Sequence, residues 1–179
     1  MQNYYYPDYV NIDLDPSDDD FDKAILTAQA AKQYFDKNKI KSFVKTSGKT
    51  GIHLYLPCEG FTFPEAKKIA DHICNEIHLL VPAITTTAFS KSQRGTKLYI
   101  DSNQNIEAHT LASAYSVRPF HTPTVSTPLE WKEVKIGLSQ YDFDINTILN
   151  RIKKKGDLFE NILNKKTMIA NTKVLGQYL

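Results

Sequence analysis

The sequence predicts an α/β (α+β) domain: a small sheet covered by helices on one face. Several short segments alternate apolar and polar residues with the period of 2 that marks half-buried strands. Two longer segments repeat apolar residues every three or four positions, as amphipathic helices do. These segments follow one another in the order strand–helix–strand–strand–helix–strand. The 179 residues, 41% hydrophobic and 23% charged, suffice for one domain with its own core.

The first strand and the first helix occupy the N-terminal end. Residues 10–16 place Val10, Ile12 and Leu14 on one face of a strand that Pro16 ends, because proline cannot extend a central strand. Residues 17–38 form the first expected helix, with Ser17 as its cap. Its apolar stripe consists of Phe21, Ala24, Ile25, Ala28, Ala31 and Phe35.

A hairpin and the second helix follow. Residues 40–46 and 52–56 are expected strands, joined by a turn at 47–51 that contains two glycines. Thr62 and Glu65 have the spacing of a capping box, with Pro64 in the first turn of the helix that they open. This helix stops before Pro82, and its stripe consists of Ala66, Ile69, Ala70, Ile73, Ile77 and Leu80.

The C-terminal half has weaker signals. Residues 85–89 are β-prone, and residues 97–100 form a strand that ends at Asp101. Residues 119–130 contain Pro119, Pro123 and Pro128, so we expect an extended loop without regular structure. Residues 139–143 are a candidate short strand, followed by a helix from about Asn146. The order of the stronger elements is that of an RRM-like sheet.

Charge is distributed unevenly although the net charge is only +2. Residues 8–22 carry seven acids and no base, whereas residues 151–173 carry seven bases and two acids. An acidic cluster beside basic stretches suits metal ions that face a polyanion. For residues 151–173 taken alone, a solvated lysine-rich helix is the simpler interpretation.

Composition also excludes some classes of protein. No apolar run approaches the length of a membrane span, and the polar, tyrosine-rich start does not resemble a signal peptide. Cys58 and Cys74 match neither a metal-binding spacing nor a disulfide framework. We therefore expect no membrane partner and a reducing, cytoplasmic setting.

Asp13 and Asp15 lie two residues apart on the polar face of the first strand. Their backbones are roughly 6.6 Å apart, which suits a pair of divalent ions about 3.5–4 Å apart. The alternative is a solvent-facing, acidic strand end, and the pair alone does not decide between the two.

The glycine-rich hairpin is a second candidate for chemistry. Its turn could cradle phosphate oxygens with amide N–H groups, while Ser47 adds a hydroxyl and Lys49 a positive charge. In the strand that follows, His53 and Tyr55 lie opposite the apolar face, on the side expected to carry the carboxylates. A purely structural hairpin remains the alternative.

A third carboxylate and an arginine follow. Asp101 ends its strand on the face opposite Leu98 and Ile100, and Gln104 and Asn105 come shortly after it. Three acids at strand ends are what a two-metal phosphoryl-transfer site requires. Arg118 supplies a guanidinium suited to bidentate contact with phosphate.

These motifs, in this order, resemble the polymerase domain of bacterial ATP-dependent ligases of non-homologous end joining, in the archaeo-eukaryotic primase superfamily. The resemblance covers roughly residues 9–165 and rests on five motifs: Asp-Leu-Asp-Pro at 13–16, Lys-Thr-Ser-Gly at 45–48 with Gly-Ile-His-Leu-Tyr-Leu-Pro at 51–57, Asp101 with Gln104-Asn105, Tyr-Ser-Val-Arg at 115–118, and Val-Ser-Thr-Pro-Leu-Glu-Trp at 125–131. It implies an RRM-like catalytic sheet within a single primase-polymerase lobe over residues 1–179. Residues 146–179 would form its basic helical tail.

The resemblance implies a two-metal nucleotidyltransferase that extends a primer, as an end-joining repair polymerase or primase. Two divalent ions, manganese or magnesium, would be held by Asp13, Asp15 and Asp101. The nucleoside triphosphate would be held by Ser47, Lys49, His53, Gln104, Ser116 and Arg118. The implied partners are a DNA primer-template or DNA end and a ligase domain or end-binding protein, in a nucleoid-associated setting.

The sequence departs from this family in two respects. Lys49 stands one position earlier than the usual lysine of the glycine-rich turn. The acidic pair also lies at residues 13–15, whereas in the family it follows an N-terminal subdomain, which we expect to be missing here. The alternative function is therefore a nucleotide- and DNA-end-binding module with little activity. A haloacid-dehalogenase-like phosphatase fits less well, because Pro16 follows the second aspartate.

Overall fold

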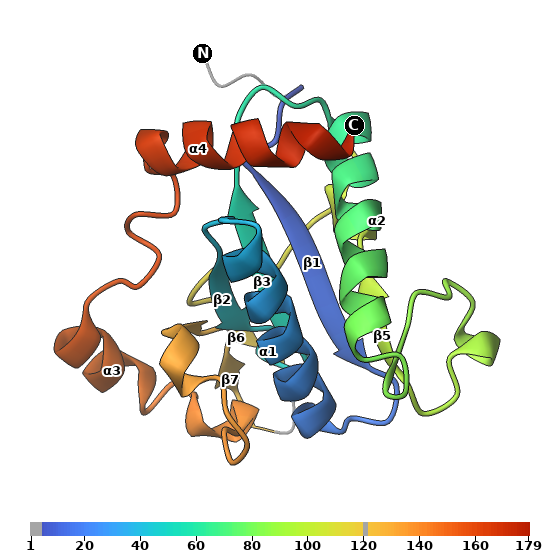
Figure 1. The fold of residues 1–179 in the computed structure, drawn as a ribbon. Coiled ribbons are helices and arrows are strands. Elements are labelled where there is room, and N and C mark those ends of the chain that lie inside the picture. Colours follow the sequence, from blue (N-terminus) through green and yellow to red (C-terminus); the bar gives the residue numbers. More distant parts are fainter. Residues whose placement is uncertain (1–4, 120–121) are drawn as a thin grey trace.

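The structure, a computed structural model, describes residues 5–119 and 122–179. Its main sheet has six strands in the order β4-β5-β1-β3-β2-β8, and β6 (Val117–Arg118) and β7 (Thr124–Val125) form a separate pair. The main strands are β1 (Tyr9–Pro16), β2 (Phe43–Thr46), β3 (Ile52–Pro57), β4 (Thr85–Thr86), β5 (Leu98–Asp101) and β8 (Pro128–Leu129). The inner order β5-β1-β3-β2 is antiparallel throughout and confirms the predicted RRM-like arrangement (Figure 1).

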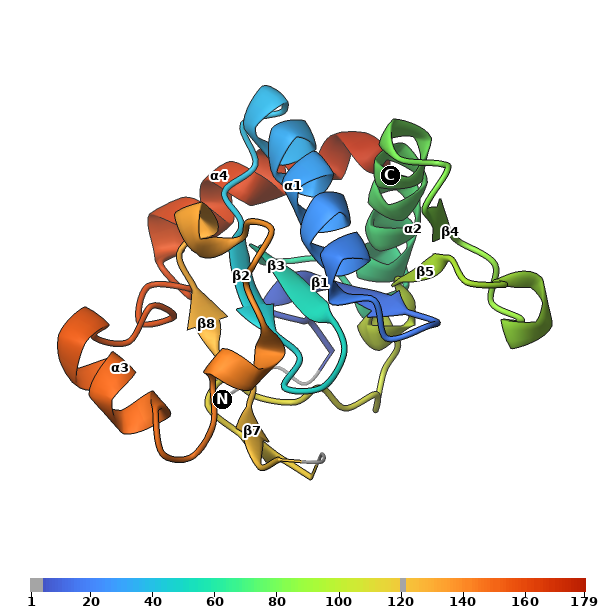
Figure 2. The ribbon, with the colours of Figure 1, turned by 90° about the horizontal axis from the view of Figure 1, so that it is seen from below.

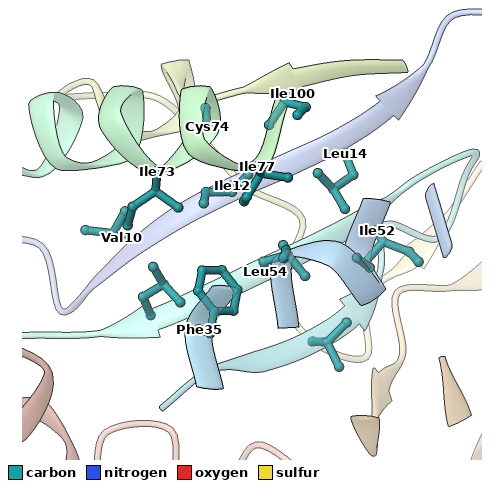
Figure 3. Packing of buried hydrophobic residues seen from close by; sticks show 14 of the residues in the cluster. Val10, Ile12, Leu14, Phe35, Ile52, Leu54, Ile73, Cys74, Ile77 and Ile100 are labelled. Carbon is teal, nitrogen blue, oxygen red and sulfur yellow. The ribbon is translucent and has the colours of Figure 1, made fainter. Parts of the chain in front are cut away.

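Two helices cover one face of this sheet, α1 (Phe21–Lys37) and α2 (Phe63–Leu80). The core lies between them and the strands, where Val10, Ile12 and Leu14 of β1 are fully buried (Figure 3). Ile73 and Ile77 of α2 pack above this strand. The apolar faces predicted for β1 and α1 are therefore confirmed, since every predicted stripe position of α1 is buried.

The starts of the two helices illustrate what local sequence decides. The capping box of α2 is present, with the Thr62 amide donating to Glu65 at 2.7 Å. The predicted cap of α1 is wrong: Asp20, not Ser17, caps a helix that begins at Phe21, and its carboxylate accepts from the Asp22 amide at 3.1 Å. Several acids stand in this stretch, and Asp19 with a positive φ of 60° turns the chain just before the helix.

The predicted loop at 119–130 is partly wrong, because β8 pairs with β2 at the edge of the sheet. Pro128 is tolerated there because an edge strand needs hydrogen bonds on one side only. Thr124, Ser126 and Thr127 are fully buried, and the Thr46 amide donates to Thr127 O at 2.9 Å. Residues 124–129 are therefore an integral part of the structure beside the hairpin.

The C-terminal part contains two helices, α3 (Ile148–Lys155) and α4 (Lys165–Leu175). The strand expected at 139–143 is instead a short 3₁₀ helix, Gln140–Asp142, because Ser139 and Asp142 cap it reciprocally. α4 lies across the ends of α1 and α2 (Figure 1), and its Leu175 is buried in the main core. None of the helices in the described residues is both long and apolar enough to cross a membrane.

The face of the sheet opposite the helices carries the polar side chains of β1. The chain between β5 and β6 passes beneath this face, as Figure 2 shows. His53 and Tyr55 point to this face but are only 5% and 4% exposed. The Tyr55 ring packs against Tyr9 and Phe159, and His53 contacts Lys45. The site described next lies on this face.

Candidate active site

Four polar side chains form one row across neighbouring strands. The register pairs Asp101 of β5 with Asp13 of β1, Asp13 with His53 of β3, and His53 with Lys45 of β2. Residues paired in this way project to the same face of a sheet. The expectation that His53 shares a face with the carboxylates is thereby confirmed.

Asp13 occupies the middle of this row. Burial raises the pKa of its carboxyl group to about 7, and the carboxylates of Asp15 and Asp101 add to the rise, while Lys45 and Arg118 oppose it. The Nε2 atom of His53 lies 3.5 Å from Asp13 Oδ1. A buried carboxyl group beside two further carboxylates is suited to bind a cation, because the cation relieves the repulsion between them.

The other two carboxylates differ in their surroundings. Asp15 pairs with Tyr99, and burial raises the pKa of Asp15, an effect that Arg94 opposes. The Oδ1 atom of Asp101 accepts from the amide of Asn103 at 2.8 Å and from its side-chain nitrogen at 2.7 Å.

The three acids share a face but are not assembled in advance. No group of three or more His, Cys, Asp or Glu side chains in the described residues already has the geometry of a metal site. The carboxylate of Asp101 accepts from the Asn103 side chain at 2.7 Å and from the Tyr99 hydroxyl at 3.2 Å.

His53 and Lys45 form the other half of the row. The Lys45 ammonium group is fully buried and lies 2.9 Å from His53 Nδ1 and 2.5 Å from Ser126 Oγ. Burial lowers the pKa of Lys45 to about 7, against the attraction of Asp13. Burial, together with the charges of Lys45 and Arg118, holds the pKa of His53 well below its usual value.

The hairpin turn brings β3 and β1 unusually close. A Cβ added at Gly51 would lie 2.2 Å from the carbonyl oxygen of Leu14. Gly48 has a φ of +75°, and a Cβ there would lie 2.5 Å from Arg118 Cγ and 2.9 Å from the Ser126 amide nitrogen. Both glycines are therefore required by close approach, which places the turn beside Arg118.

The turn differs from the predicted phosphate cradle. The Ser47 hydroxyl accepts from the amides of Lys49 and Gly51, at 3.1 and 3.0 Å, and the Ser47 amide donates to Gly51 O at 2.8 Å. These three N–H groups stabilise the turn itself. The Ser47 hydroxyl accepts two bonds, so its own hydrogen remains free to be donated elsewhere.

A pocket of about 200 Å³ opens beside this row. Its lining includes most of the predicted site residues, namely Asp13, Asp15, Ser47, Lys49, His53, Gln104 and Arg118. Asp101 and Ser116 do not line it, and the Ser116 hydroxyl donates to Ser113 O at 2.9 Å. Residues 110–112, from the chain beneath the sheet, complete the wall.

Sequence reasoning missed Lys45 and Ser126 as members of this site. Lys45 stands in the middle of a short strand, and its alternation with Val44 would have placed it on the same face as His53. Ser126 reaches the site only because residues 124–127 pack against the hairpin, and this contact has no local signal in the sequence.

A larger neighbouring pocket of about 400 Å³ shares Gln104, Leu111 and Ala112 with the first. Tyr9 and Tyr55 line it with edge-to-face rings, 4.8 Å between centroids. The two pockets together extend along β1 past the acidic residues.

The family model described as "LigD, primase-polymerase domain" matches residues 1–159. The bifunctional non-homologous end joining protein LigD of Bacillus subtilis is 39% identical over 153 residues, which cover 84% of this chain and 25% of that protein. The multifunctional non-homologous end joining DNA repair protein LigD of Mycobacterium tuberculosis is 31% identical over 153 residues, which cover 84% of this chain and 20% of that protein.

A solved structure of a relative matches as well. The polymerase domain from Mycobacterium tuberculosis Ligase D in complex with DNA has a TM-score of 0.80 to this chain at 28% identity, covering 88% of this chain and 55% of that one. The present chain spans a quarter or less of the length of the two LigD proteins.

Proposed function

This chain belongs to the LigD primase-polymerase family, and we propose that it catalyses template-directed nucleotidyl transfer in end-joining repair. In the proposed reaction the 3′-hydroxyl oxygen of a DNA primer or DNA end attacks the α-phosphorus of a nucleoside triphosphate. A new P–O bond forms, the bond to the β-phosphate oxygen breaks, and pyrophosphate leaves.

One observation carries the proposal: the cross-strand row divides the site into an acidic half and a half of hydrogen-bond donors. Asp101 and Asp13 lie at one end of the row, and His53 and Lys45 lie at the other. Arg118 lines the pocket beside them. A triphosphate with bound cations needs both halves, because the cations seek carboxylates while the phosphate oxygens seek donors.

Asp13, Asp15 and Asp101 would hold the divalent ions, manganese or magnesium. Such ions, when bound, neutralise phosphate charge and lower the pKa of the attacking hydroxyl group. The residues fit this role because they present hard oxygen ligands on one face, and because burial and the charges of Asp15 and Asp101 raise the pKa of Asp13.

The donors in the pocket would bind and orient the triphosphate. Ser47 accepts two amide bonds, so its hydroxyl hydrogen is available to a phosphate oxygen. Arg118 offers a planar fork of donors, and Lys49 and Gln104 line the same pocket. Ser116 is proposed to lie near the triphosphate. The Ser126 amide donates to Ser116 O at 2.9 Å, and the Ser126 hydroxyl contacts Lys45.

We further propose a DNA primer-template or DNA end as the partner, together with a ligase domain or end-binding protein. Support for DNA comes from the solved relative, which is described in complex with DNA. Support for a ligase comes from the names of the matched proteins, all LigD proteins of end joining.

Primer extension with manganese and nucleoside triphosphates tests the proposal. The unaltered chain is expected to add nucleotides to a primed DNA, whereas Asp13→Ala and Asp101→Ala abolish incorporation and leave the fold intact. Asp36→Ala, an exposed acid on α1, is the matched control and is expected to retain full activity. Incorporation by either site variant would rule out the two-metal assignment.

A second outcome would favour the binding-module alternative. If the unaltered chain forms no product but binds a nucleoside triphosphate in the presence of manganese, it serves as a nucleotide- and DNA-end-binding module. If it neither extends a primer nor binds the nucleotide, both functions are wrong.

A further inference from the structure

We propose that Lys45 is a positioning residue that holds His53 in the tautomer carrying its hydrogen on Nε2. His53 then offers the pocket a fixed N–H donor for an oxygen acceptor such as a phosphate oxygen. The identity of that acceptor rests on the proposed function, whereas the tautomer is argued from the contacts of Lys45.

The donors and acceptors around Lys45 can be assigned in order. Ser126 Oγ lies 2.9 Å from Thr46 O, and a carbonyl oxygen only accepts, so the Ser126 hydroxyl donates there. Its oxygen is then left to accept from Lys45 Nζ at 2.5 Å. Thr46 O also accepts from Lys45 Nζ, at 3.4 Å. Two of the three ammonium hydrogens are therefore used.

The third hydrogen of Lys45 points to His53. The Lys45 Nζ atom lies 2.9 Å from His53 Nδ1, and below its pKa of about 7 Lys45 is an ammonium group, which can only donate. Nδ1 must then be an acceptor, which means that it carries no hydrogen. A neutral imidazole with a bare Nδ1 carries its hydrogen on Nε2.

The same contact requires the neutral form of His53, because an imidazolium carries a hydrogen on Nδ1 and cannot accept there. The ring is also buried beside Lys45. His53 lines the pocket, and its Nε2 atom lies 3.5 Å from Asp13 Oδ1. The ring therefore acts as an uncharged donor, with Lys45 behind it and the pocket in front.

Asp13 would also favour a hydrogen on Nε2, so the test has to remove this influence. In Asp13→Asn the carboxylate becomes an amide that can donate or accept, and Lys45 alone is left to select the tautomer. Lys45→Met then removes the ammonium group and retains much of the buried chain volume. Comparing Asp13→Asn with and without Lys45→Met isolates the contribution of Lys45.

Nitrogen NMR of histidine-labelled protein at about pH 6 reports the tautomer directly. The sequence has five histidines, and loss of one signal in His53→Gln assigns His53. We expect the Nε2–H tautomer in the unaltered protein and in Asp13→Asn, and a mixture of both tautomers in Asp13→Asn/Lys45→Met. An Nδ1–H tautomer or an imidazolium in either of the first two proteins overturns the proposal. So does a pure Nε2–H signal in the double variant.

Nucleotide binding gives an independent readout. We expect Lys45→Met and His53→Ala each to weaken nucleoside triphosphate binding about tenfold, and the combined variant Lys45→Met/His53→Ala to be no weaker than His53→Ala. Additive losses would show that Lys45 does not act through His53. The NMR experiment needs no nucleotide, so a failure of the proposed function leaves the tautomer proposal separately testable.

Discussion

At the scale of single residues, the proposed metal ligand Asp13 is a buried carboxyl group whose charge costs stability. Burial and two neighbouring carboxylates raise its pKa to about 7. The folded chain therefore binds a proton at Asp13 at pH values where the unfolded chain has already lost it. Stability without metal falls as the pH rises from about 4 to about 7, because the unfolded state then binds fewer protons at this residue.

Asp13→Asn should consequently stabilise the metal-free protein at pH 8, by on the order of 1–3 kcal/mol. The variant and the unaltered chain should differ little near pH 4, where the carboxyl group is protonated in both states. Urea unfolding with a chelator at the two pH values measures the difference. An Asp13→Asn protein less stable at pH 8 would contradict the assignment of Asp13 as a strained, cation-seeking carboxylate.

Arg118 is a second single residue of the pocket lining whose contribution can be tested. Replacing it with alanine removes the guanidinium fork, so we expect Arg118→Ala to weaken nucleotide binding by at least about tenfold with little loss of stability. Titration calorimetry with manganese and a nucleoside triphosphate measures this. Lys153→Ala removes an exposed charge of α3 and is the control. Equal affinities of the two variants would remove Arg118 from the site.

At the scale of elements, the hairpin turn and residues 124–127 form one unit. The Thr124 hydroxyl donates to Gly48 O at 2.6 Å, and the Thr127 amide donates to the Thr46 hydroxyl at 3.0 Å. Hydrogen bonds to the hairpin thus fix residues 124–127 against the turn. This contact brings Ser126 to Lys45.

The fit between the turn and this segment can be tested with two glycines of nearly equal φ. Gly48 and Gly60 have φ values of +75° and +80°, but a Cβ at Gly60 would meet nothing within 4 Å. Gly60→Ala should therefore cost about 1 kcal/mol, from the backbone alone. Gly48→Ala should cost at least about 2 kcal/mol more, because the Ser126 backbone has to move. Thermal unfolding compares them, and equal losses would argue against close packing at Gly48.

At the scale of the whole molecule, the two faces of the sheet carry different kinds of residue. The helices α1 and α2 bury the apolar side chains of β1 on one face, while the acidic residues and His53 lie on the other. Substitutions on the polar face therefore leave the main core unchanged. The helix α4 joins this core from the C-terminal end, because Leu175 is fully buried and Asn171 donates to Lys41 O and Pro57 O, both at 2.8 Å.

Leu175→Ala should destabilise the whole domain by about 2–4 kcal/mol in a single cooperative transition, as expected for a leucine in a shared core. Leu163→Ala lies on the same C-terminal segment with the side chain 51% exposed, and should cost less than about 1 kcal/mol. Denaturant unfolding followed by two probes measures both. A separate early transition in the Leu175 variant would show that α4 folds apart from the core.

Much of the molecule was predictable because its signals are local. Alternation with period 2 placed Val10, Ile12 and Leu14 in the core and Asp13 on the opposite face, and the capping box marked the start of α2. The family, and with it the fold class, also followed from motifs in the sequence, and both are confirmed. The roles assigned to the individual site residues remain predictions.

The missed edge strand and the missed Lys45 contact have a common physical cause. Residues 128–129 became a strand, and Lys45 acquired Ser126 as a partner, through contacts between segments about 80 residues apart. No propensity of a short segment encodes such a contact. The sequence by itself determined which side chains share a face, because strand geometry depends on neighbours along the chain. Only the tertiary structure decided which faces are covered and which donors are oriented, because burial and hydrogen bonding depend on neighbours in space.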